Sequence, residues 1–210
     1  MKGLFYKEAR CLWQYGKSYI LLVVIFFGLA FLNGGSEGAN PLWLLYPVFF
    51  VGSLPASLLS ADEKDGWLTY CDTLPIGRRQ IVAVKYVASA ALTAAIVVLA
   101  LLIGALTGQP TVAGGTAVPL SILIPLLLAV GLGVPALMYP VMFRFGATKG
   151  RAVYMAVVMV AAATCAVLMT SESVSGALDA LPILPVIVAA AAVFIGSWAL
   201  SVKWFEGREL

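Results

Sequence analysis

The sequence predicts an all-α, polytopic membrane protein with six transmembrane helices, and three observations support this class. Hydrophobic residues make up 62% of the 210 residues and charged residues only 11%, with a mean hydropathy of +1.01, which is outside the range of soluble domains. Six apolar stretches each approach the ~20 residues that cross ~30 Å of hydrocarbon. All 13 Lys and Arg residues fall on one side of the resulting topology. We therefore expect one transmembrane domain over residues 1–210.

The chain begins with a basic, aromatic segment, residues 2–17. At 100° per residue its polar side is formed by Lys7, Arg10, Gln14 and Lys17. This pattern predicts an amphipathic interfacial helix on the cytoplasmic leaflet. Glu8 projects among the apolar positions, where it can pair with a partner or a headgroup. Because the basic segment is long and aromatic, the apolar run after it indicates a retained span and not a signal peptide.

The six predicted spans alternate with short polar segments. They cover residues 18–32, 42–61, 81–106, 118–143, 152–170 and 182–202. Every Lys and Arg lies in a terminus, in the second or fourth connection or, for Lys85, at the adjoining end of the third span, whereas the other connections carry only Glu37, Glu172 and Asp179. The positive-inside rule then predicts that both termini are cytoplasmic.

The first predicted cytoplasmic loop, residues 62–80, contains a second amphipathic segment. Asp62 is placed as an N-cap, with Asp65 able to reach back as in a capping box. The positions i, i+3, i+4 and i+7 of one helical face are occupied by Trp67, Tyr70, Cys71 and Leu74. The helix is expected to end near Leu74 because Pro75 disfavours helical geometry in the residue before it. This face either docks on a partner or lies against the headgroups as interfacial aromatics.

Several function classes are disfavoured by what the chain lacks. It has no histidine and only three scattered cysteines, so no disulfide framework, metal site or catalytic residue is predicted. No predicted span has a charged residue near its middle; Lys85 is expected at a cytoplasmic end, with its ammonium snorkelling to water. Ion-driven transporters and intramembrane enzymes usually need buried charged or catalytic groups. Energy for any transport is therefore expected from outside the membrane.

The prolines of the second and fourth spans have two interpretations. Prolines interrupt the second and fourth predicted spans at Pro47, Pro55, Pro119, Pro125, Pro135 and Pro140. They indicate either ordinary kinks with close packing or segments that bend to open a path.

The residues 146–150, Gly-Ala-Thr-Lys-Gly, have the wrong spacing for a phosphate-binding P-loop. We thus expect no nucleotide site on this chain and no nucleic-acid partner.

Two short blocks resemble the permeases of ABC-2 type transporters. The first is Asp62-Glu63-Lys64, Trp67, Tyr70, Leu74-Pro75, Arg78, Ile81-Val82 and Lys85-Tyr86, which is similar to their first cytoplasmic loop. The second runs from Pro140 to Gly146 with Lys149-Gly150-Arg151, and is similar to the second cytoplasmic loop of a small six-span subfamily. That subfamily includes permeases of bacterial peptide-toxin exporters of the phenol-soluble modulin type. Gly77 stands where a serine is common.

This resemblance implies a permease subunit in a bacterial cytoplasmic membrane. It would form a dimer with a second permease copy, identical or paralogous, and pair with a separate ATP-binding subunit that carries the ATP and Mg. A coupling helix in the first loop would dock on that subunit. The implied coupling residues are Asp62, Glu63, Trp67, Tyr70, Cys71, Leu74, Pro75, Arg78 and Arg79. Arg78 and Arg79 can alternatively serve only as topology anchors.

The second loop has two interpretations, a simple anchored loop or a second contact with the ATPase. Its implied residues are Arg144, Gly146, Lys149 and Arg151. The resemblance suggests that a peptide or other amphipathic molecule is exported, and membrane lipids are the remaining expected partners. The rival functions are an integral membrane enzyme, which lacks its catalytic groups here, and a non-transporting accessory or immunity protein.

Overall fold

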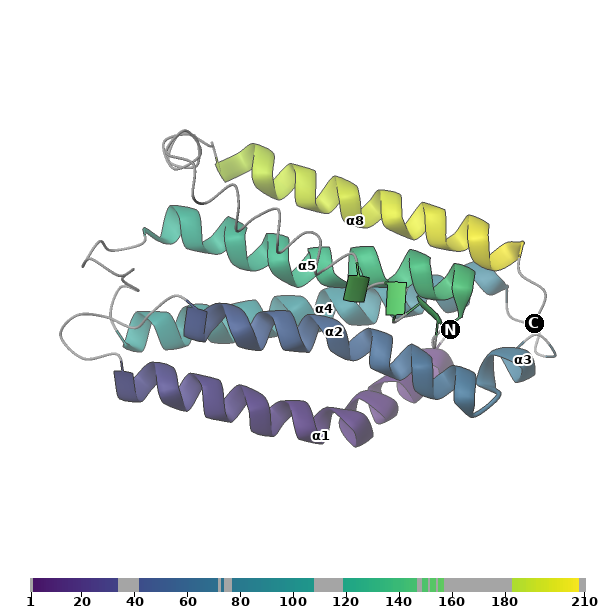
Figure 1. Cartoon of the computed structure of the whole chain (residues 1–210), viewed down its shortest axis with the longest axis horizontal. Helices are drawn as coiled ribbons and strands as arrows, with labels where there is room; N and C mark the ends of the chain where they lie inside the picture. Colours follow the sequence, from purple (N-terminus) through teal and green to yellow (C-terminus); the bar gives the residue numbers. More distant parts are fainter. Residues whose placement is uncertain are drawn as a thin grey trace.

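In the computed structural model the chain forms a bundle of α-helices (Figure 1). The structure describes residues 2–33, 42–71, 73, 77–107, 119–146, 149–150, 152–153, 155–156 and 183–207. Within these residues there is no β-strand. The all-helical class predicted from composition is therefore confirmed.

Five of the described helices are long. They are α1 (Lys2–Asn33), α2 (Leu42–Lys64), α4 (Arg78–Leu106), α5 (Leu120–Phe145) and α8 (Ile183–Glu206). Each contains a stretch long and apolar enough to cross a membrane. A short helix, α3 (Trp67–Cys71), lies between α2 and α4. The chain is thus a multi-pass membrane protein.

The long helices lie side by side, and neighbouring helices in the sequence run in opposite directions where short connections join them (Figure 1). The N-terminal end of α1, the start of α4 and the C-terminal ends of α2, α5 and α8 gather at the end of the bundle where α3 lies (Figure 1). We call this the α3 end. The fifth predicted span, 152–170, lies outside the described residues except at four positions. The topology of six transmembrane spans therefore stays a prediction.

The prediction that residues 2–17 form a helix of their own is wrong, whereas their position on the cytoplasmic leaflet stays a prediction. These residues continue without a break into the first span as α1, which is 32 residues long. Figure 1 shows that the N-terminal part of α1 turns toward the α3 end of the bundle. Two of its side chains, Leu4 and Glu8, are buried against the other helices, so this part packs on the bundle as well as facing its surroundings.

Close packing of three helices centres on Gly131 of α5. A Cβ atom at Gly131 would lie 2.5 Å from Cγ2 of Thr93 in α4 and 3.1 Å from Cγ1 of Val48 in α2. The Thr93 hydroxyl donates to the Gly131 carbonyl oxygen at 3.1 Å. Small residues of this kind let membrane helices approach closely. The helices α2 and α5 both continue through their internal prolines, and the two interpretations of these prolines stay predictions.

Hydroxyl groups join α4 to α8. The Tyr86 hydroxyl lies 2.7 Å from Ser197 Oγ and 2.8 Å from Ser201 Oγ, and Ser197 donates to the carbonyl oxygen of Ala136 in α5 at 2.6 Å. All these side chains are buried. A buried hydroxyl without a partner is costly, so these contacts fix the register of α8 on the bundle.

Candidate functional site

The helix α3 is attached to the bundle through one face. A turn at Asp65 and Gly66 separates it from α2, and Gly66 has a positive φ of 69°. Leu68 and Cys71 are buried in the core at the α3 end, with 4% and 0% of their surface exposed. Tyr70, by contrast, is 56% exposed. The short helix therefore presents Tyr70 outward while its opposite face holds it in place.

Three predicted features of this segment need correction. Asp62 is not an N-cap, because α2 continues through it to Lys64 and its side chain is buried. Asp65 consequently has no capping box to complete. Cys71 does not share an exposed face with Tyr70, since it packs in the core. Leu74 and Pro75, the predicted end of the helix, lie outside the described residues, as does Asp72.

Trp67 occupies the boundary between the two faces of α3. Its ring packs partly against the core, and its centroid lies 5.6 Å from that of Tyr70. The Lys7 ammonium of α1 stands 4.8 Å from the centroid of the same ring. A cation at this distance over an indole is attracted by the ring quadrupole. Trp67 thus contacts α1 as well as lying on α3.

Beside Trp67 is a mostly buried cluster of four charged side chains, which we call the charge cluster: Lys7, Glu8, Asp62 and Lys85. Lys85 Nζ lies 2.9 Å from Glu8 Oε1 and 2.5 Å from Asp62 Oδ2. Lys7 donates to the other oxygen of Asp62. Lys85, Glu8 and Asp62 are 2%, 4% and 5% exposed. With two positive and two negative groups, the charge cluster is neutral as a whole.

Burial of charges is tolerated only where they are paired and hydrogen-bonded. In the charge cluster each carboxylate contacts both ammonium groups, although the Lys7–Glu8 contact is longer, at 3.6 Å. The four residues come from α1, α2 and α4, and Lys7 adds the contact with α3. The charge cluster therefore connects the short helix with three long helices.

Sequence reasoning missed this cluster. Lys85 does not snorkel to water but is buried between two carboxylates, so that prediction is wrong. Glu8, expected to pair with a partner or a headgroup, finds its base within the same chain. Two features of the sequence could have indicated the cluster: Glu8 is a single acid on an apolar helical face, and Lys85 is a single base at the start of an apolar span. An unpaired charge is energetically costly in both places, so the two residues could have been expected to pair.

Other charged residues line the surface at the same end. Arg78 donates to the carbonyl oxygens of Phe205 and Glu206 at 3.1 and 3.3 Å, which joins the start of α4 to the end of α8. The guanidinium carbon of Arg79 lies 5.2 Å from the centroid of the Trp198 ring. That of Arg144 lies 4.8 Å from the Trp204 centroid and 5.2 Å from the Phe145 centroid.

The second predicted loop is described in part. Gly146 ends α5 with a positive φ of 83°, a conformation that favours glycine, and its N–H donates to the Met142 carbonyl oxygen at 2.9 Å. Lys149 is exposed. Arg151 lies outside the described residues. Glu63, the remaining predicted coupling residue, is half-buried in the last turn of α2.

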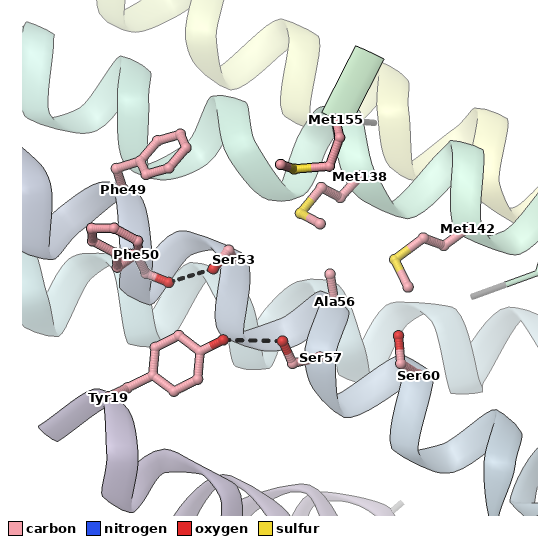
Figure 2. Close-up of a pocket in the computed structure, with 10 residues that line it drawn as sticks. All are labelled: Tyr19, Phe49, Phe50, Ser53, Ala56, Ser57, Ser60, Met138, Met142 and Met155. Carbon is pink, nitrogen blue, oxygen red and sulfur yellow. Dashed lines mark hydrogen bonds between the residues drawn. The ribbon is translucent and has the colours of Figure 1, made fainter. Parts of the chain in front are cut away.

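A cavity of about 310 Å³ lies between α1, α2 and α5 (Figure 2). Figure 2 shows the hydroxyls of Tyr19, Ser53, Ser57 and Ser60 on one side and the thioethers of Met138, Met142 and Met155 on the other. The Tyr19 and Ser57 hydroxyls are 3.0 Å apart, and Ser53 donates to the Phe50 carbonyl oxygen at 2.7 Å. None of the ten residues that line the cavity is charged. Such a lining suits a neutral or apolar group that carries a few hydrogen-bonding atoms.

Comparison with known proteins identifies a family. The profile of the family described as ABC-2 family transporter protein matches residues 3–206. No curated protein and no solved structure matches the chain significantly.

Proposed function

Because the chain belongs to the ABC-2 family of transporter proteins, we propose that it is the permease subunit of an ATP-binding cassette exporter. In this proposal the chain exports a peptide or other amphipathic substrate, and a separate ATPase subunit supplies the energy. The chain works as a dimer with a second permease copy in a bacterial cytoplasmic membrane. Its α3 end faces the cytoplasm, in keeping with the positive-inside rule.

One observation carries the proposal: α3 exposes Tyr70 while being fixed to three long helices. Leu68 and Cys71 fix it to the core, and Trp67 contacts Lys7 of the charge cluster. A force applied to α3 is therefore passed to α1, α2 and α4 together. This is the connection that a coupling helix needs, because closure of two ATPase subunits can only open a path if the spans move with the docked helix.

The structure also changes which residues we expect to dock. The docking surface is centred on Tyr70, with the exposed part of Trp67 beside it, since Cys71 is buried. Asp62 acts behind this surface through its contacts with Lys7 and Lys85, and not at the interface. Arg78 joins α4 to α8, so its contribution is to position the start of α4.

Co-purification tests this proposal. Aromatic anchors at interfaces commonly contribute about 2 kcal/mol or more, so Tyr70→Ala should weaken binding of the ATPase subunit roughly thirtyfold and stop export. The matched control is Tyr46→Ala, which removes another exposed tyrosine, 42% exposed, near the start of α2. This helix begins at the end of the bundle away from α3 (Figure 1). An ATPase yield that is equal for the two variants would refute docking at α3.

The uncharged cavity is our candidate for part of the substrate path. Ser57→Phe would place a ring in the cavity and should block export without loss of the ATPase subunit. Ser57→Ala removes only the hydroxyl contact with Tyr19 and should leave most of the export activity. Normal export by Ser57→Phe would show that the substrate passes elsewhere.

A further inference from the structure

The surface at the α3 end carries exposed positive charges that form no ion pair with another described residue. Arg79, Arg144 and Lys203, which we call the basic rim, are exposed. None of these three side chains has a carboxylate of another described residue within 4 Å. Both arginines lie over aromatic rings, which leaves the edges of their guanidinium groups to donate hydrogen bonds.

Two members of the basic rim line a pocket. An open pocket of about 400 Å³ is formed by Arg144, Lys203, Trp204 and Gly207, at the C-terminal ends of α5 and α8. Arg144 is positioned by Trp204, whose ring centroid is 4.8 Å from the guanidinium carbon. Both cations are also attracted by the partial negative charge at the C-terminal ends of their helices. That attraction does not require a pocket, and it leaves the N–H groups at the edge of the guanidinium free to bind a ligand. The pocket therefore suits an anion.

An exposed stripe of α8 leads to this pocket. Its residues follow at helical spacings of three and four: Val193, Gly196, Leu200, Lys203 and Gly207. Val193 and Leu200 are 57% and 40% exposed, and a Cβ atom at Gly196 would meet nothing within 4 Å. The stripe is apolar along the span and basic only at its end. A ligand that matches it has an anionic head and a long apolar tail.

We propose that this pocket binds the phosphate of an anionic membrane lipid, with Arg144 and Lys203 as its ligands and an acyl chain along the α8 stripe. Basic pockets between helices at the cytoplasmic face are suited to such headgroups, and an indole at the same level lies at its preferred depth. The apolar stripe favours a lipid over a soluble phosphate, which would gain nothing from Leu200 and Val193. The inference does not depend on α3 or on the ATPase.

Native mass spectrometry of the detergent-solubilised protein can test it, with phosphatidylglycerol and phosphatidylcholine added at equal concentration. We expect phosphatidylglycerol to be retained in preference, and Arg144→Gln/Lys203→Gln to lower its affinity about thirtyfold. The matched control Lys64→Gln/Lys149→Gln removes two exposed lysines from the same end outside the pocket, and should lower it only slightly. Arg144→Lys, which keeps the charge, should retain most of the lipid and shows that substitution at this position does not unfold the protein.

Several results would overturn the proposal. They are equal retention of the two lipids, an equal loss in the control variant, and displacement of phosphatidylglycerol by millimolar inorganic phosphate. Loss of the ATPase subunit from Arg144→Gln/Lys203→Gln with full retention of lipid would also contradict it, because the basic rim would then be a contact for the ATPase. Lipid loss with the ATPase still bound to Tyr70 supports it separately from the proposed permease function.

Discussion

The charge cluster and the basic rim lie at the same end of the bundle, but their positive charges have opposite surroundings. In the charge cluster two lysines and two carboxylates are paired and mostly buried, so their interactions stay within the chain. In the basic rim three cations are exposed, the two arginines lie over aromatic rings, and none of the three has an ion-pair partner among the described residues. Paired charges join helices to one another, whereas unpaired charges remain available to molecules outside the chain.

This difference predicts that Lys85→Met has the largest effect on stability. The substitution leaves Glu8 and Asp62 with one base instead of two, and one buried negative charge is then uncompensated. Removal of one partner from a buried pair typically costs about 3–5 kcal/mol in the free energy of unfolding. Unfolding of the detergent-solubilised protein measures this loss, with exposed Lys64→Met as the control. A loss equal to that of Lys64→Met would contradict the paired arrangement.

The second prediction concerns rescue. Glu8→Gln in the Lys85→Met background leaves Lys7 with Asp62, which restores neutrality. We expect more than half of the lost stability to return, although each substitution alone is destabilising. A double-mutant cycle on the free energy of unfolding gives the coupling, which should lie at or above the upper end of the range of about 0.5–3 kcal/mol that is usual for residues in contact. Strictly additive losses would show that Glu8 and Lys85 do not interact.

A smaller effect is expected from Lys7→Met. Lys7 is more accessible than Lys85, with 21% of its side chain exposed, so water can partly replace it beside Asp62. The cost should be about 1–2 kcal/mol, from a charged hydrogen bond and the contact with Trp67. Amide hydrogen exchange should rise in α3 while α5 and α8 remain protected. Arg10→Met, on the exposed side of the same helix, is the control. Equal amide exchange in α3 of the two variants would show that the charge cluster does not stabilise α3.

The smallest effect is expected in the basic rim. Arg79→Gln should change the free energy of unfolding by no more than about 0.5 kcal/mol, because the side chain is exposed and forms no ion pair with another described residue. The same unfolding measurement used for Lys85→Met makes the comparison direct. A loss above 2 kcal/mol would mean that the basic rim also stabilises the fold, and the contrast between the two regions would disappear.

Much of the fold followed from hydropathy alone. The predicted spans 42–61 and 81–106 correspond to α2 and α4, and 118–143 and 182–202 to α5 and α8, with ends shifted by no more than four residues. This accuracy has a physical cause, since a membrane helix must be apolar over a length set by the bilayer. The errors lie at the α3 end, where α2 extends past Asp62 and α1 begins at Lys2.

The candidate site was less predictable because its contacts are distant in sequence. A count of basic residues predicts only that Lys85 and Arg144 both lie on the cytoplasmic side. In the structure Lys85 is buried between carboxylates, whereas Arg144 lies over the Trp204 ring. The periodicity of the first loop placed Trp67 and Cys71 on one face, but it could not tell which side of a five-residue helix packs on the bundle. Partner choice depends on how α1, α2 and α4 meet, and no local pattern encodes that.

The charge cluster also constrains the order in which the protein can be assembled in the membrane. Glu8 is synthesised 77 residues before Lys85, so at ~5–20 residues per second it waits roughly 4–15 s for its base. During that interval Lys7 can compensate only one of the two carboxylates, so α1 and α2 cannot bring both to their final buried positions at low cost. The first three long helices are therefore expected to leave the insertion machinery together, when the start of α4 arrives and the charges balance.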